Sequence, residues 1–272
     1  MPSKKTVVIE NIFLERYDQA TGTISDDFVS LRQISAAITK WGQGLSTGNP
    51  ANFMKDIVRS PTRNDTFPAS VVALGWTARQ EMGTAPDGSG GCFRFVPLPP
   101  NQTTAFLNNE PDPNLVAKPH PVQSLSLATA SRRFGRSHET WLAHVAANLG
   151  VIHTHLALHG PTRLIGLELL QTNVGLGDGE VDALLLGTLD DNTTVLVSCE
   201  MKGPREVLDE DQIERGALLI SASAPGTPVI PVGVKALTGG LVWVVEFAVN
   251  FPPLTKLSEG VYQLTPPVPG IG

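Results

Sequence analysis

The chain has few cysteines and lacks a long apolar run. Among its 272 residues there are only two cysteines, Cys92 and Cys199, which excludes a disulfide framework and favours a reducing, cytoplasmic location. No apolar segment reaches the roughly 18 residues of a membrane-spanning helix, so we expect no membrane partner. The first apolar run is short and is broken by Glu10 and Asn11, unlike a secretory signal. A hydrophobic content of 41% indicates a globular protein with a core.

Basic residues are not in excess, because the formal net charge is −6. Residues 1–95 hold ten Lys and Arg against nine Asp and Glu, whereas residues 96–272 hold ten against seventeen. The acidic excess therefore belongs to the second half and gathers in residues 178–214. Local carboxylates of this kind can hold a divalent cation, so an acidic total does not exclude an enzyme that acts on nucleic acid.

The first third of the chain reads as short helices followed by a strand. We expect a helix over 26–44, capped by Asp26 or Asp27, and a second helix that begins near Pro50 and stops at Pro61. A third short helix over 67–80 and a strand over 90–98 complete the order. This succession suggests a winged-helix module in residues 1–96. The proline-rich residues 97–124 are expected to form a linker.

Residues 125–272 read as an alternation of helices and strands. A helix is expected over 138–149, with Ser137 as its cap and Gly150 after its end. Apolar runs and turn residues predict further elements: a strand over 162–173, a β-hairpin of 181–189 with 194–202, an acidic helix over 205–223, and strands over 228–236 and 240–249. The fold class is therefore α/β (α+β).

Charged residues stand at one end of the predicted hairpin. The strand "TVLVSCEMK" alternates so that Val195, Val197 and Cys199 share one face, while Glu200 and Lys202 share the other. The turn "DDNT" places Asp182 opposite Glu200. Buried charges are tolerated when they are paired or bind a metal, and two carboxylates can hold Mg²⁺.

This order of residues resembles the PD-(D/E)xK nucleases, in which an acidic residue precedes a Glu-x-Lys in a hairpin. Here the motif is Val181-Asp182 followed by Glu200-Met201-Lys202, with valine in place of the usual proline. The resemblance covers about residues 131–225. It implies roles for Glu139 on the preceding helix and for Gln212 on the following helix. It also implies a restriction-endonuclease-like mixed sheet flanked by helices.

The same resemblance implies a function. It points to a Mg²⁺-dependent type II restriction endonuclease that hydrolyses double-stranded DNA, with Asp182 and Glu200 as metal ligands and Lys202 as the assisting cation. A homodimer is expected, because cutting two strands usually requires two sites. Candidate phosphate contacts are basic residues in both halves, and Lys55 and Arg59 lie four apart on one helix face. The full set is Lys55, Arg59, Arg63, Arg132, Arg133 and Arg136.

Other interpretations remain open at this point. Glu-x-Lys at a strand end is usually a solvated ion pair, and Glu180 is an alternative to Asp182 on the opposite face of its strand. The histidines of "VIHTHLALHG" (153, 155 and 159) have no partner at zinc-site spacing and read as core or surface residues. A repair or recombination nuclease with the same core is one alternative function, and a non-catalytic DNA-binding regulator is another.

Overall fold

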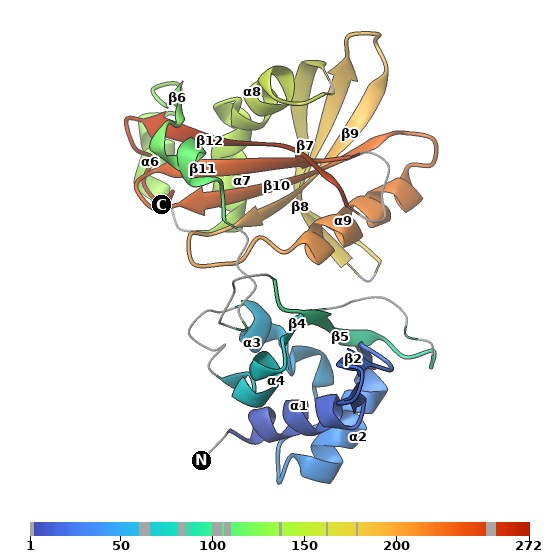
Figure 1. The fold of residues 1–272 in the computed structure, drawn as a ribbon. Helices are drawn as coiled ribbons and strands as arrows, with labels where there is room; N and C mark the ends of the chain where they lie inside the picture. Colours follow the sequence, from blue (N-terminus) through green and yellow to red (C-terminus); the bar gives the residue numbers. More distant parts are fainter. Residues whose placement is uncertain are drawn as a thin grey trace. The chain divides into compact units, whose positions relative to one another are not determined.

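A computed structural model describes residues 3–59, 66–80, 85, 87–99, 105, 110–135, 138–161, 163–177, 179–248 and 254–272. The chain divides into two compact units, Met1–Asn108 and Asn109–Gly272 (Figure 1). Each unit has its own hydrophobic core. No helix in the described part of the chain is long and apolar enough to span a bilayer.

The first unit combines short helices with a small antiparallel sheet of order β3-β5-β4. Its helices are α1 (Lys4–Leu14), α2 (Leu31–Trp41), the 3-10 helix η1 (Pro50–Asn52), α3 (Lys55–Arg59) and α4 (Ala69–Ala73). Its strands are β1 (Tyr17–Asp18), β2 (Thr23–Ile24), β3 (Phe28–Ser30), β4 (Trp76–Gln80) and β5 (Gly91–Pro97). In its core, the ring of Phe95 contacts the rings of Phe13 and Phe93 edge to face.

Helix α2 begins later than the sequence suggested. Its N-cap is Ser30, whose hydroxyl accepts the N–H of Gln33 while the Gln33 side chain accepts the N–H of Ser30. This reciprocal capping box satisfies two backbone donors at the start of the helix. The expected caps, Asp26 and Asp27, lie before β3 and do not cap α2. Residues 28–30 instead form β3, paired with β5.

The expected helix over 67–80 is wrong in its second half. Only Ala69–Ala73 is helical, after which Gly75 adopts a φ of +81° and the chain turns into β4. Val71 alone of this helix is buried, whereas three residues of β4 are buried against the core. Helix α1 was not expected from the sequence, and it is held by the buried side chains of Val8, Ile9, Ile12 and Phe13.

The second unit is built on a seven-stranded mixed sheet of order β6-β12-β11-β10-β9-β8-β7. Its strands are β6 (His120–Gln123), β7 (Leu164–Leu176), β8 (Gly179–Leu189), β9 (Thr194–Lys202), β10 (Val229–Leu237), β11 (Leu241–Phe247) and β12 (Lys256–Thr265). Its helices are α5 (Pro113–Ala117), α6 (Thr129–Phe134), α7 (Glu139–Asn148), α8 (Val151–Leu158) and α9 (Glu210–Ser223). The pairs β9–β10 and β6–β12 are parallel, and the others are antiparallel.

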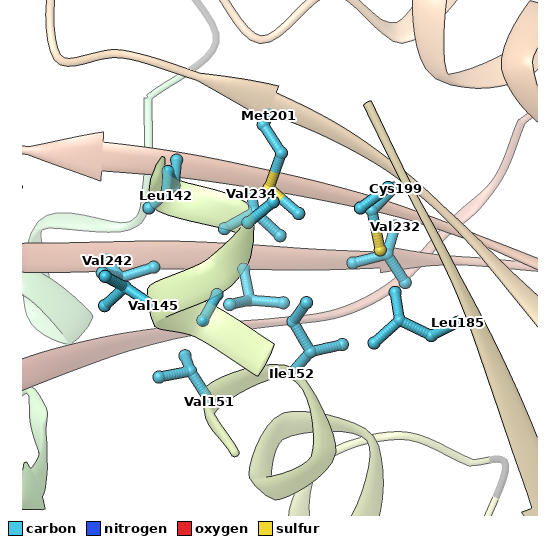
Figure 2. Close-up of a cluster of buried hydrophobic side chains, with 14 of the residues drawn as sticks. Leu142, Val145, Val151, Ile152, Leu185, Cys199, Met201, Val232, Val234 and Val242 are labelled. Atoms are coloured by element: carbon cyan, nitrogen blue, oxygen red, sulfur yellow. The ribbon is translucent and has the colours of Figure 1, made fainter. Parts of the chain in front are cut away.

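Helices cover both faces of this sheet. Figure 2 shows the cluster on one face, where Leu142 and Val145 of α7 and Ile152 of α8 pack against Cys199 and Met201 of β9. On the other face, α9 buries Ala217 and Ile220 against apolar residues of the sheet. The predicted α/β class, a mixed sheet flanked by helices, is therefore confirmed in this coarse form.

The predicted hairpin of residues 181–189 and 194–202 is confirmed as β8 and β9. The turn between them is tight: the carboxylate of Asp191 accepts the N–H of Thr193, and Asn192 adopts a φ of +66°. Asparagine tolerates this left-handed backbone better than most residues, which fixes the register of the two strands.

The proline-rich segment is not a free linker throughout. From residue 110 onward it belongs to the second unit, because α5 lies within it and β6 pairs in parallel with β12. Prolines do not prevent a strand here, because β6 is an edge strand of the sheet and an edge strand accepts proline.

The histidine-rich stretch forms helix α8, and only His155 is buried. Its Nε2 lies 3.0 Å from the Ser258 hydroxyl and its Nδ1 lies 3.0 Å from the Tyr262 hydroxyl. Ser258 donates to Glu246, so Nε2–H donates to Ser258 and Nδ1 accepts from Tyr262. Burial, followed by the neighbouring His159, lowers the pKa of His155 to about 3. This histidine is a neutral core residue.

Candidate active site

Asp182 and Glu200 meet at one end of the hairpin. The antiparallel pairing of the hairpin ends at Ala183 with Cys199, and Asp182 and Glu200 are the next residues of the two strands, near enough for the Glu200 charge to act on Asp182. A carboxylate oxygen of Asp182 accepts the backbone N–H of Met201 at 2.7 Å. The structure thus brings the two carboxyl groups to the same edge of the sheet.

Lys202 stands between two carboxylates. Its Nζ lies 2.6 Å from Oε1 of Glu200 and 3.1 Å from Oε1 of Glu139. The side chains of Lys202 and Glu200 are each only 8% exposed. Glu139 is the first residue of α7, whose apolar side chains dock on the sheet and so hold the start of the helix at the end of β9. A helix, a strand and its hairpin partner therefore contribute to one site.

Alternation along β9 explains why these charges do not enter the apolar core. Cys199 and Met201 point into the cluster beneath α7 and α8, as Figure 2 shows. Glu200 and Lys202 are offset by one residue and lie outside this cluster, where Lys202 meets Glu139 at the start of α7. The strand can therefore end in charged residues while its apolar side remains packed.

Burial and the surplus of carboxylates perturb the acids of the site. Burial, followed by the Glu200 carboxylate, raises the pKa of Asp182 to about 7, against the opposing effects of the Met201 N–H and Lys202. Burial also raises the pKa of Glu200, although Lys202 opposes it. The pKa of Lys202 would be lowered by burial, but Glu200, Glu139 and Asp182 outweigh that effect and raise it. Lys202 is therefore held as a cation among three carboxyl groups.

This charge balance suits a divalent cation. Within the described residues, no three His, Cys, Asp or Glu side chains gather closely enough to form a metal site by themselves. Mg²⁺, however, keeps several waters and is usually held by one or two carboxylates together with substrate phosphates. Asp182 and Glu200 supply such a pair, and a cation beside them would relieve the repulsion that raises the pKa of Asp182.

Gln212 lies on α9, the helix that follows the hairpin. Its Oε1 is buried and has no hydrogen-bond partner among the described residues. In that part of the chain, no hydrogen bond joins it to Glu139, Asp182, Glu200 or Lys202. The alternative acid Glu180 is exposed and pairs with Gly175 on β7, away from Glu200.

The basic residues expected to contact phosphates lie in different environments. Arg132 is half-buried, and one nitrogen of its guanidinium donates to the carbonyl and the hydroxyl of Ser124, so it has a structural contact; its role at a phosphate stays a prediction. Arg133 and Lys55 are exposed. Arg59 belongs to α3, but its side chain lies outside the described residues, as do Arg63 and Arg136 entirely.

Two polar neighbours of the site, Asn173 and Asp209, were not expected from the sequence. On β7, Asn173 stands opposite Asp182, because Thr172 pairs with Ala183 and Val174 with Val181. Its backbone is left-handed, with a φ of +54°, and its side-chain oxygen lies 3.4 Å from the hydroxyl of Thr140, next to Glu139. A positive φ in a non-glycine residue within a strand is a feature of functional sites. The sequence carries no clear signal for Asn173, because it follows two other polar residues, Gln171 and Thr172.

Asp209 was also missed. It caps α9 by accepting the N–H of Asp211, and its charge contributes to the raised pKa of Glu200. The acidic composition of residues 205–214 concealed this one position among several similar carboxylates.

Comparison with known proteins gives no assignment for this chain: no family model matches it, and no similar curated protein or solved structure is found.

Proposed function

We propose that this protein is a Mg²⁺-dependent endonuclease of the PD-(D/E)xK type that hydrolyses double-stranded DNA at specific sequences, as a type II restriction enzyme does. The observation that carries the proposal is the convergence of Asp182, Glu200, Lys202 and Glu139 at one end of β8 and β9. Two facing carboxylates and a buried ammonium group are the residue types that metal-assisted phosphodiester hydrolysis requires.

The order of elements around the site supports the same proposal. Helix α7 precedes three consecutive antiparallel strands, β7, β8 and β9, and α9 then crosses to β10, which is parallel to β9. This order agrees with the resemblance to the PD-(D/E)xK nucleases, in which a helix precedes the hairpin that carries Glu-x-Lys and another helix follows it.

Each residue has a chemical role in this proposal. Asp182 and Glu200 hold Mg²⁺, which when bound supplies Lewis-acid activation of water and of the scissile phosphate. Lys202 donates hydrogen bonds to the phosphate and balances the negative charge that develops as the water attacks phosphorus and the 3′ oxygen leaves. Glu139 fixes the position of the Lys202 ammonium group through its 3.1 Å contact.

The first unit supplies DNA binding in this proposal. Its helices are followed by the pair β4 and β5, and the earlier strand β3 lies beside β5, an arrangement that agrees with a winged-helix module. Lys55 is exposed there and is available to a phosphate. Double-strand cutting further implies a homodimer. Both cysteines are buried free thiols, which fits a cytoplasmic location.

The test is plasmid cleavage with Mg²⁺ by the wild type, Asp182→Ala and Lys202→Ala. Asp190→Ala is a matched control, because Asp190 is exposed in the turn at the far end of the same hairpin. We expect the two site variants to lose cleavage and the control to retain it. Undiminished cutting by both site variants would remove the mechanism.

The products distinguish the related functions. Discrete fragments from a long DNA indicate a restriction enzyme, whereas diffuse or junction-specific products indicate a repair or recombination nuclease. Tight sequence-specific binding without cleavage under any divalent cation indicates a regulator in which the site has a structural role.

A further inference from the structure

A second lysine, Lys235, lies beside the candidate site and is not used by the mechanism above. In the parallel pairing of β10 with β9, Lys235 is the direct partner of Lys202. Residues paired in this way project from the same face of the sheet, and neighbouring strands are about 4.8 Å apart. Lys235 is also buried, with only 4% of its side chain exposed.

Two buried lysines on adjacent strands repel each other unless anions compensate them. Lys202 has two close carboxylates, Glu200 and Glu139. Lys235 has a weaker partner: its Nζ lies 3.6 Å from Oε1 of Glu110, and the Glu110 side chain is 53% exposed. An ion pair at this distance to a solvated carboxylate contributes little to stability.

A purely structural role does not account for this arrangement. On its other side, Lys235 pairs with Trp243 of β11, which is fully buried. An apolar residue would therefore suit the position that Lys235 occupies in the sheet. A buried ammonium group is costly, and a structural one is normally held by a close, buried acceptor. An exposed carboxylate that can swing into water is instead suited to be exchanged for another anion.

We propose that Lys235 binds a DNA phosphate next to the scissile one, and that Glu110 occupies this position when DNA is absent. This inference rests on the proposed nuclease function. The two neighbouring lysines then contact adjacent phosphates. Lys202 contacts the scissile phosphate, and Lys235 contacts a phosphate that is bound but does not react. Glu110 competes with the substrate, so that the protein without DNA avoids an uncompensated ammonium group.

The experiment measures binding of a labelled mixed-sequence duplex over a range of salt concentrations, with Ca²⁺ in place of Mg²⁺ to prevent cleavage. Lys235→Met keeps most of the apolar stem and removes the charge. We expect it to weaken binding and to reduce the slope of log K against log salt by about one. Lys256→Met is the matched control, because Lys256 is an exposed lysine on β12 of the same sheet. The control is expected to keep the wild-type slope.

Glu110→Gln gives an opposite and independent result. Removing the competing carboxylate is expected to tighten binding several-fold. In the Lys235→Met background the same substitution is expected to have no effect, which separates local competition from a general change in charge. Because Glu110 is half exposed, this variant tests the proposal even if Lys235→Met does not fold.

The outcomes separate this inference from the proposed function. If the wild type cleaves DNA but Lys235→Met keeps the wild-type salt slope, or Glu110→Gln fails to tighten binding, the phosphate role of Lys235 is wrong and the nuclease proposal stands. If the wild type neither binds nor cleaves DNA, both are wrong.

Discussion

The Asp182 carboxylate accepts the backbone N–H of Met201 on the neighbouring strand, at 2.7 Å, and the charge of Glu200, the residue before Met201, acts on it. This hydrogen bond stabilises the carboxylate, yet burial and the Glu200 charge outweigh it and raise the pKa of Asp182 to about 7. The site therefore opposes the ionisation that the proposed binding of Mg²⁺ requires. Such tension between stability and function is common where catalytic groups are gathered.

Asp182→Asn should stabilise the metal-free protein at alkaline pH. The folded-state pKa of about 7 lies above the ordinary value of about 3.9, so the wild type loses stability as pH rises between these values. Asparagine keeps the acceptor for Met201 and never ionises. We expect its melting temperature to exceed that of the wild type by a few degrees at pH 8 and to match it near pH 4, as measured by calorimetry in EDTA. If the melting temperature rose by the same amount at pH 4 and at pH 8, the raised pKa of Asp182 would not be the cause.

Glu139→Gln should reduce cleavage without unfolding the protein. Lys202 would keep its 2.6 Å contact with Glu200 but lose one of its two carboxylate partners, so its ammonium group would be less firmly placed. Loss of a positioning partner typically reduces activity by about 10–100-fold. Initial rates at saturating DNA measure the effect, with Glu168→Gln on the exposed part of β7 as the control. A rate equal to that of the control would exclude a role for Glu139.

His155 should make the second unit sensitive to acid. The folded-state pKa of His155, about 3, lies below the ordinary value of about 6.5. Its contribution to the free energy of unfolding is therefore present above pH 6.5 and is lost as the pH falls towards 3. The groups facing it are Tyr262, Ser258 and His159, with Glu246 behind Ser258. We expect His155→Gln to be less stable at pH 7 but to lose less stability between pH 7 and 5. Urea unfolding at both pH values provides the comparison.

Substitutions of Arg132 and Arg133 should affect different properties, the first mainly stability and the second mainly DNA binding. Arg132→Ala removes a charged hydrogen bond to Ser124 and is expected to lower the free energy of unfolding by about 1.5–3 kcal/mol. Arg133→Ala is expected to leave unfolding unchanged and to weaken DNA binding with a smaller salt dependence, because this side chain is exposed. Thermal unfolding and duplex titration on both variants measure the two effects. If the two variants had the same free energy of unfolding, the structural role given to Arg132 would be wrong.

Part of the site was predictable because it depends on local rules. Alternation along residues 194–202 decides which side chains enter the core, and the short turn at Asp191 and Asn192 fixes the register that brings Asp182 opposite Glu200. Both rules act over a few residues, so the sequence by itself determined this half of the site.

The rest was decided by packing between distant segments. Glu139 reaches Lys202 across 63 residues because α7 docks its apolar side on the sheet. Lys235 comes beside Lys202 only through the parallel pairing of β9 with β10, and β6 finds β12 in the same non-local way. Parallel neighbours and helix docking depend on how side chains from remote elements fill shared space, for which no local pattern exists. The sequence therefore determined the hairpin and its charges, and the tertiary structure decided which other residues surround them.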